Sequence, residues 1–171
     1  MKKLLILIVA VLLVSSLLPV FAGGAREAAP DEKVIRIADQ VPGLITPGSW
    51  DGQAFSLNSS IYEYLLEIDV DTGDLVPCLA REWSTADGKT WTFKLQEGVT
   101  FHNGSPFTSA DVRFTIERTQ DPALGHLQQQ NFAAVVSIET PDDYTVVLHL
   151  DQVRPTFVYR FTDYNMPILS S

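Results

Sequence analysis

The chain has 171 residues, of which 46% are hydrophobic, and this is enough for one domain with a buried core. Its formal net charge of −9 at pH 7 makes it a poor partner for the phosphates of DNA or RNA, so we exclude nucleic acid as a ligand. The single cysteine, Cys78, has no second thiol with which to form an internal disulfide. Its neighbours Pro77 and Leu79 indicate a small packed residue, not a catalytic thiol.

The N-terminus has the pattern of a secretory signal peptide. Lysines precede an uninterrupted apolar run over Leu4–Val14, and small residues lead to a cleavage point after Ala22. The sequence therefore predicts a cleavable signal peptide over residues 1–22. The alternative is a membrane anchor, which Pro19 disfavours because it interrupts the run before the roughly 20 residues that a membrane span needs.

Residues 23–33 are small, charged and proline-containing, so we predict a flexible linker there. A lipid anchor would need a cysteine directly after the cleavage point, whereas position 23 is glycine, and we therefore expect no lipoprotein. Together these features predict a product that is secreted and free in the periplasm. Residues 34–171 would form its folded part.

The first folded elements are predicted from periodicity. The alternation over Lys33–Ala38 predicts a strand, and the prolines and glycines of Asp39–Asp51 predict a loop. Apolar residues spaced by three and four over Gln53–Glu67 predict a helix. The segment Ile68–Pro77 then reads as two short extended pieces around Thr72-Gly73; its aspartates lack the spacing of an EF-hand loop, so we do not predict a calcium site.

The centre of the chain carries the strongest local signals. Asp87-Gly88 is a tight-turn dipeptide, and Lys89–Leu95 after it alternates polar with apolar residues. These signals predict a β-hairpin between Glu82–Thr85 and Lys89–Leu95.

A helix should follow this hairpin. Asn103-Gly104 supplies a second turn, and Thr108 stands three residues before Asp111, which is the spacing of an N-cap with an acidic residue in the first turn. The pattern predicts a helix from about Ser109 to Arg118.

The remaining segments predict a loop, a hairpin and the start of a helix. Thr119–Asn131 is mostly polar and is expected to form a loop with a short helix. Val135–Glu139 and Tyr144–Leu150 flank the turn Pro141-Asp142-Asp143, which predicts a second hairpin. The aromatic residues after Pro155 indicate another helix.

No catalytic, metal or cofactor signature is found in the sequence. The histidines, His102, His126 and His149, show no zinc-binding spacing, no GxSxG segment offers a nucleophile, and no glycine pattern would hold a nucleotide phosphate. We interpret His102 as part of a structural turn. The sequence therefore predicts neither an enzyme nor a cofactor.

The central motifs resemble a known family. Pro77, Ala80 and Trp83 at three-residue spacing are followed by K-T-W-T-F-K-L, G-V-T-F-H-N-G and F-T-S-A-D-V-R-F. S-W-D-G-Q and I-Y-E-Y-L-L precede them, and I-E-T-P-D-D-Y-T-V-V-L-H-L follows. This order resembles the family 5 extracytoplasmic solute-binding proteins, the peptide- and nickel-type binding components of ABC importers, over nearly all of the chain from Val34 onward.

The resemblance implies a fold class and a function. It implies an α/β fold corresponding to the N-terminal part of lobe I of a two-lobe periplasmic binding protein, with two β-hairpins and flanking helices. The implied function is capture of peptides or similar small solutes for an inner-membrane ABC permease, with ATP handled by a separate subunit. By the resemblance, the ligand-contacting residues are Trp50, Asp51, Phe55, Gln128, Tyr164 and Asn165.

Members of this family are far longer and contain a second lobe. We therefore expect the chain to be a fragment or truncated product that binds solute weakly by itself, with an open sheet edge and an exposed apolar face. Two alternatives stay open, a sensory input domain of a larger receptor and a nonfunctional remnant. For Phe55 the alternative to a ligand contact is a core position, in which its ring packs with Tyr62 and Leu66 on one row of the predicted helix.

Overall fold

The computed structural model describes residues 54–171, with side chains from residue 58 onward. The predicted signal peptide, linker, first strand and loop lie outside the described residues, as do Trp50 and Asp51. No helix in this described part is both long and apolar enough to cross a membrane.

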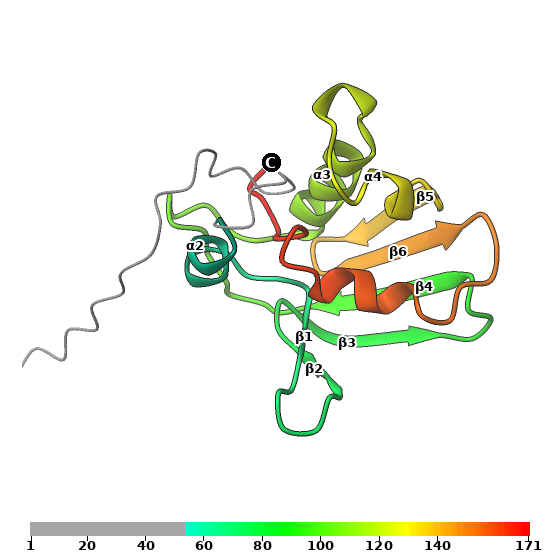
Figure 1. The fold of residues 1–171 in the computed structure, drawn as a ribbon, viewed down its shortest axis with the longest axis horizontal. Coiled ribbons are helices and arrows are strands. Elements are labelled where there is room, and N and C mark those ends of the chain that lie inside the picture. The colour runs from blue at the N-terminus through cyan, green and yellow to red at the C-terminus, as the bar shows by residue number, and fades with distance from the viewer. Residues whose placement is uncertain (1–53) are drawn as a thin grey trace, which may run out of the picture. The chain divides into compact units, whose positions relative to one another are not determined.

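The described chain is built on a 4-stranded antiparallel sheet with the order β3-β4-β6-β5 (Figure 1). Its strands are β3 (Ala80–Thr85), β4 (Thr90–Leu95), β5 (Val135–Asp142) and β6 (Thr145–Leu150). Both predicted hairpins are confirmed, because β3 pairs with β4 and β5 pairs with β6. The two hairpins join through β4 and β6.

The turn of the first hairpin explains its Asp-Gly dipeptide. Asp87 Oδ1 accepts hydrogen bonds from the backbone N–H groups of Lys89 and Thr90, at 2.8 and 2.6 Å. Gly88 has a φ of 65°, and a Cβ atom there would lie 3.0 Å from the side chain of Val153. Glycine is therefore required both by the backbone conformation and by the close approach of the chain after β6.

The sheet has one apolar and one polar face. Across the strands, Trp83, Phe93 and Val146 form one apolar row, and Trp91, Leu148 and Ile138 form another. The alternate positions on the opposite face include Thr92, Lys94 and His149, none of which is fully buried. The period-two alternation thus places polar side chains at these positions of the open face, and the expectation of an exposed apolar face stays a prediction.

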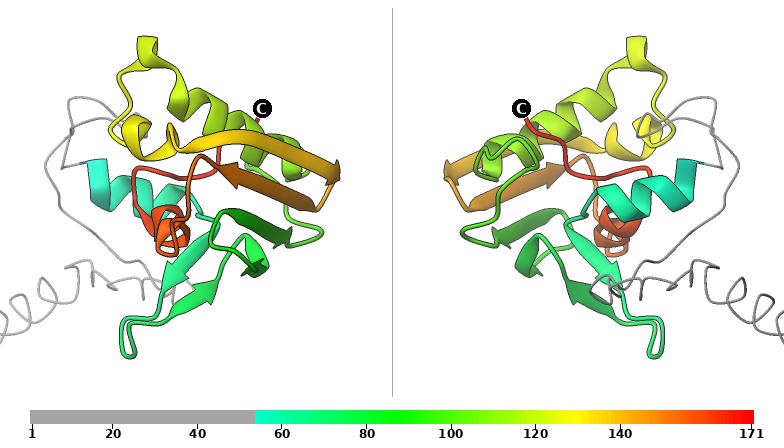
Figure 2. Two further views of the ribbon diagram at one scale, coloured as in Figure 1. Left: turned by 90° about the vertical axis from the view of Figure 1, so that its right-hand side faces the viewer. Right: turned by 90° about the vertical axis from the view of Figure 1, so that its left-hand side faces the viewer.

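Helix α3 (Ser109–Gln120) lies over the apolar face of the sheet, as the two side views show (Figure 2). Its N-terminus has the predicted capping box, in which the N–H of Thr108 donates to Asp111 Oδ2 at 2.8 Å. The predicted helix is confirmed and extends two residues further, to Gln120. The C-terminal segment runs along α3, where the N–H of Leu169 donates to Thr115 Oγ1 at 3.0 Å.

Aromatic rings fill the space between the sheet and its helical cover. The cover is formed by α3, α4 (Gln129–Phe132) and the 3₁₀ helix η2 (Phe157–Thr162), whereas the 3₁₀ helix η1 (Pro122–Leu124) has no buried residue. The ring of Phe161 packs edge-on against Phe93, Phe132 and Phe157, with centroids 5.0, 5.4 and 5.7 Å apart. The helix predicted after Pro155 is thus present as η2, and its phenylalanines close the core.

The first predicted helix is too long. Helix α2 covers Ala54–Ile61, and the chain then becomes extended and forms β1 (Leu66–Ile68), which pairs with β2 (Leu75–Pro77). The carbonyls of Tyr64 and Leu65 accept the N–H groups of Leu79 and Ala80, at 3.0 and 2.8 Å. These long-range backbone hydrogen bonds replace the i→i−4 bonds of a helix, so the apolar spacing over Gln53–Glu67 was a misleading signal.

Candidate functional site

Two segments that are distant in sequence meet in a polar cluster. The connection into α4 supplies His126 and Gln128, α4 itself supplies Asn131, and the chain after η2 supplies Asp163 and Asn165. We call these five residues the Asp163 cluster. It brings together two of the predicted ligand-contacting residues, Gln128 and Asn165.

The carboxylate of Asp163 organises this cluster. Its Oδ1 accepts the backbone N–H of Asn165 at 2.9 Å and the Asn165 side-chain amide at 3.0 Å. Its Oδ2 accepts a hydrogen bond from Gln128 Nε2, and Gln128 Oε1 in turn accepts from Asn131 Nδ2 at 2.6 Å. Gln128 and Asn165 are both buried, so these bonds satisfy amides that have little access to water.

His126 is held in one tautomer. Its Nδ1 accepts the backbone N–H of Gln128 at 3.1 Å, so the proton of the neutral ring sits on Nε2 and is directed to the backbone of Asn165. Burial lowers the pKa of His126, and the positive charge of Arg118 acts in the same direction, whereas Asp163 and Asn165 oppose it. The ring is therefore a neutral part of the cluster at pH 7.

Tyr64, which precedes β1, interacts electrostatically with the carboxylate of Asp163. Burial raises the pKa of its hydroxyl, and the negative charge of Asp163 raises it further. Within the described chain this hydroxyl oxygen is buried without a hydrogen-bond partner. The phenol is thus a neutral group next to the Asp163 cluster.

The other predicted contact residues are placed only in part. The side chain of Tyr164 is 38% exposed, and in the sequence Tyr164 stands between Asp163 and Asn165 of the cluster. Phe55 belongs to α2, but the structure does not describe its side chain, and Trp50 and Asp51 lie outside the described residues. The predicted set of ligand contacts stays a prediction.

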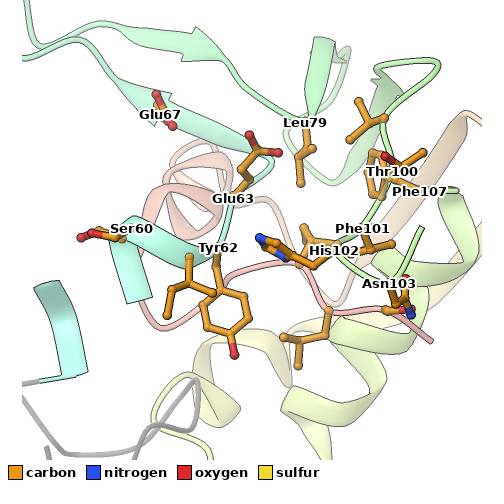
Figure 3. Close-up of a pocket in the computed structure, with 16 residues that line it drawn as sticks. Ser60, Tyr62, Glu63, Glu67, Leu79, Thr100, Phe101, His102, Asn103 and Phe107 are labelled. Carbon is orange, nitrogen blue, oxygen red and sulfur yellow. The ribbon is translucent and has the colours of Figure 1, made fainter. Parts of the chain in front are cut away.

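A pocket of about 720 Å³ lies elsewhere, between the segments after α2 and after β4 (Figure 3). Its charged and polar lining includes Glu63, Glu67, His102 and Asn103. Sequence reasoning missed it. It assigned Glu63 and Glu67 to a helix and His102 to a structural turn, and no local signal shows that these segments share a pocket.

The described residues offer little for catalysis or metal binding. No group of three or more histidine, cysteine, aspartate or glutamate residues in residues 54–171 could hold a metal ion. Burial raises the pKa of Cys78 to about 11, so its sulfur is a thiol and not a reactive thiolate at neutral pH.

Comparison with known families decides the identity of the chain. The family model of the bacterial extracellular solute-binding proteins, family 5 Middle, matches residues 74–170, which is more than half of the chain. The chain belongs to this family. The match contains both hairpins of the sheet, helix α3 and the Asp163 cluster.

Curated relatives of this family 5 protein are much longer than the chain. A putative ABC transporter peptide-binding protein of Brucella ovis is 30% identical over 152 residues, which is 84% of this chain and 28% of the relative. The nickel-binding periplasmic protein of Escherichia coli is 40% identical over 85 residues, which is 47% of this chain and 15% of the relative. The chain thus spans about 28% of the Brucella relative that it matches.

Solved structures agree with the family assignment. AgaA of A. tumefaciens R10, determined in complex with agropinic acid, matches with a TM-score of 0.71 and 27% identity over 75% of this chain and 26% of AgaA. OppA of Haemophilus influenzae, in complex with RPPGFSPFR, matches with a TM-score of 0.68 and 28% identity over 75% of this chain and 29% of OppA. The predicted α/β binding-protein fold, with its open sheet, is confirmed by these matches.

Proposed function

We propose that the chain acts within the substrate-binding component of an ABC importer and takes part in capturing peptides or similar small solutes. The observation that carries this proposal is the family 5 match over residues 74–170. It is supported by similarity to binding proteins whose names state a peptide or nickel ligand. In such a component two lobes close over the solute, and the closed form is presented to the inner-membrane permease.

The Asp163 cluster is the part of the described chain that we propose faces the solute. It fixes Gln128 and Asn165 by hydrogen bonds to one carboxylate and leaves Tyr164 exposed beside them. The amides of Gln128 and Asn165 are bonded within the protein and would position the exposed ring of Tyr164, which is suited to stack on a solute. Trp50, Asp51 and Phe55 remain further proposed contacts of the solute.

The location and partners follow from the same proposal. The protein would work in the periplasm after removal of the signal peptide over residues 1–22, without a lipid anchor. It would need no cofactor and catalyse no reaction. Its protein partner would be the permease, and ATP hydrolysis would belong to a separate cytoplasmic subunit.

Native mass spectrometry of the protein secreted by its own host tests this proposal. We expect a weakly held peptide or similar small solute, because the chain spans about 28% of its Brucella relative, and we expect less of it when Gln128 and Asn165 are both replaced by alanine. The matched control is Glu117→Gln, an exposed residue of α3 outside the cluster. Protein without any solute after gentle purification, and after addition of a peptide mixture, would contradict the proposal.

A further inference from the structure

The pocket of about 720 Å³ contains none of the described residues that we assign to solute capture. Its volume lies within the range of about 300 to 1,000 Å³ that is usual for small-molecule sites. Four parts of the chain form it: the segment from Ser59 to Glu67, Leu79 in the connection between β2 and β3, the turn after β4, and the C-terminal segment. It therefore requires its own explanation.

The walls of the pocket are fixed by backbone hydrogen bonds. The N–H of Ile168 donates to the carbonyl of Glu63 at 3.0 Å, which joins the C-terminal segment to the segment after α2. The N–H groups of Phe101 and Phe107 donate to the carbonyls of Ser105 and Val99, at 2.9 and 3.0 Å, which closes the turn after β4. The pocket is thus formed before any ligand arrives.

Acidic side chains dominate the charge in the pocket. Its acidic lining residues are Glu63 and Glu67, its other ionisable side chains are Tyr62 and His102, and none of its lining residues in the described chain is lysine or arginine. The ion pairs within residues 54–171 join Arg81 to Glu97, His149 to Glu139 and Arg154 to Asp151, so they leave both pocket carboxylates uncompensated.

The two carboxylates differ in their surroundings. Glu67 interacts with the thiol of Cys78, whose pKa is raised by burial and further by the negative charges of Glu67 and Glu63. Glu63 has no such thiol contact, and Figure 3 shows its carboxylate on the side of Leu79, with the ring of Tyr62 pointing the opposite way. Glu63 is therefore the carboxylate available to a ligand.

The rest of the lining contains both polar and apolar residues. Leu79, Phe107 and Ile168 are buried, and the rings of Phe101 and Phe107 pack edge to face with centroids 6.1 Å apart. Aromatic faces and aliphatic side chains bind hydrocarbon, and aromatic faces also attract cations. An ammonium ion alone would leave this apolar part of the pocket unused.

We propose that this pocket binds an organic cation, consisting of an ammonium or guanidinium group on an apolar body, with Glu63 as the counter-charge. The apolar body lies against Leu79, Phe107 and Ile168, and the cationic group lies at Glu63. Nothing in this assignment depends on which solute the Asp163 cluster binds.

Three probes of similar shape and different charge test the proposal on the full chain. They are phenethylammonium, 2-phenylethanol and 3-phenylpropionate, and binding is followed by titration of the methyl NMR signals of Leu79 and Ile168. We expect phenethylammonium to bind most tightly, the alcohol more weakly and the carboxylate most weakly, with the shifts at both methyl groups. Equal binding of the three probes, or shifts confined to other residues, would overturn the proposal.

A pair of variants tests the role of Glu63. Glu63→Gln keeps the size of the side chain but removes its charge, and we expect phenethylammonium to bind about threefold to tenfold more weakly while binding of the alcohol is unchanged. Glu117→Gln removes one negative charge from an exposed position outside the pocket and should leave both affinities unchanged. Equal loss in both variants would show a nonspecific effect of net charge and would reject the site.

Discussion

The Asp163 cluster and the pocket use their carboxylates in opposite ways. Asp163 accepts three hydrogen bonds from amides of Gln128 and Asn165, so its charge stabilises the junction between two chain segments. Glu63 lines an open pocket and takes part in none of the ion pairs of the described residues. Carboxylates that are equally visible in the sequence thus differ in role, because one is used by the fold and the other is left for a ligand.

The largest effect on the free energy of unfolding is expected in the aromatic core next to the Asp163 cluster. Phe161 is fully buried on η2, two residues before Asp163, and packs against three other phenylalanine rings. We expect Phe161→Ala to lower the free energy of unfolding by about 3 to 5 kcal/mol, because a large cavity replaces the ring. Urea titration measures this, and a loss below about 1 kcal/mol would show that η2 does not close the core.

Removal of the organising carboxylate should have the next largest effect. Asp163→Ala leaves three amide donors without their acceptor, and we expect a loss of about 2 kcal/mol in the free energy of unfolding. Asp163→Asn is the matched control, since it keeps one acceptor oxygen and should lose about half as much. Equal stability of wild type and Asp163→Ala would show that the cluster does not hold the two segments together.

The pH dependence of stability tests the neutral state of His126. Because burial lowers the folded pKa of His126 below its unfolded value of about 6.5, the unfolded chain binds a proton that the folded chain does not. Stability should therefore be complete above pH 6.5 and fall as the pH decreases below it. The aspartates with lowered pKa, such as Asp87, lose their contribution only below about pH 4.

The control for this prediction is His126→Gln, which cannot be protonated. Unfolding in urea at pH 7.5, 6.5 and 5.5 should show a smaller decrease in stability for this variant than for the wild type. His102 and His149 are present in both proteins, so the difference isolates one ring. Identical decreases in the two proteins would reject a role for His126.

The smallest effect on stability is expected in the pocket. Glu63 is exposed, so Glu63→Gln should change the free energy of unfolding by no more than about 0.5 kcal/mol. Urea titration beside Asp163→Asn compares the loss of one negative charge at the two sites. A loss of equal size at both positions would remove the distinction between a structural and an available carboxylate.

The sequence predicted those parts of the fold in which local and long-range interactions agree. The turn at Gly88 and the capping box of Thr108 and Asp111 are formed by neighbouring residues, so both hairpin and helix could be found from the sequence. The end of α2 could not, since the extended chain at Tyr64 and Leu65 depends on backbone partners at Leu79 and Ala80.

The candidate site shows the same division. The family resemblance pointed to Gln128 and Asn165, but nothing in the sequence places both on Asp163, which is 35 residues from Gln128. The pocket combines segments from Ser59 to Ser170, and the motifs I-Y-E-Y-L-L and G-V-T-F-H-N-G that contribute to it do not show that they meet. Sites built from several distant segments are determined by the tertiary structure and are therefore the part that sequence patterns describe least.

Uptake of a radiolabelled peptide mixture by the host tests the central claim most directly. Cells that lack the gene should take up less peptide than the parent strain, and the wild-type gene should restore uptake while the gene with Gln128→Ala and Asn165→Ala should not. Undiminished uptake of peptides and of other small solutes in the deletion strain would contradict a role in ABC import.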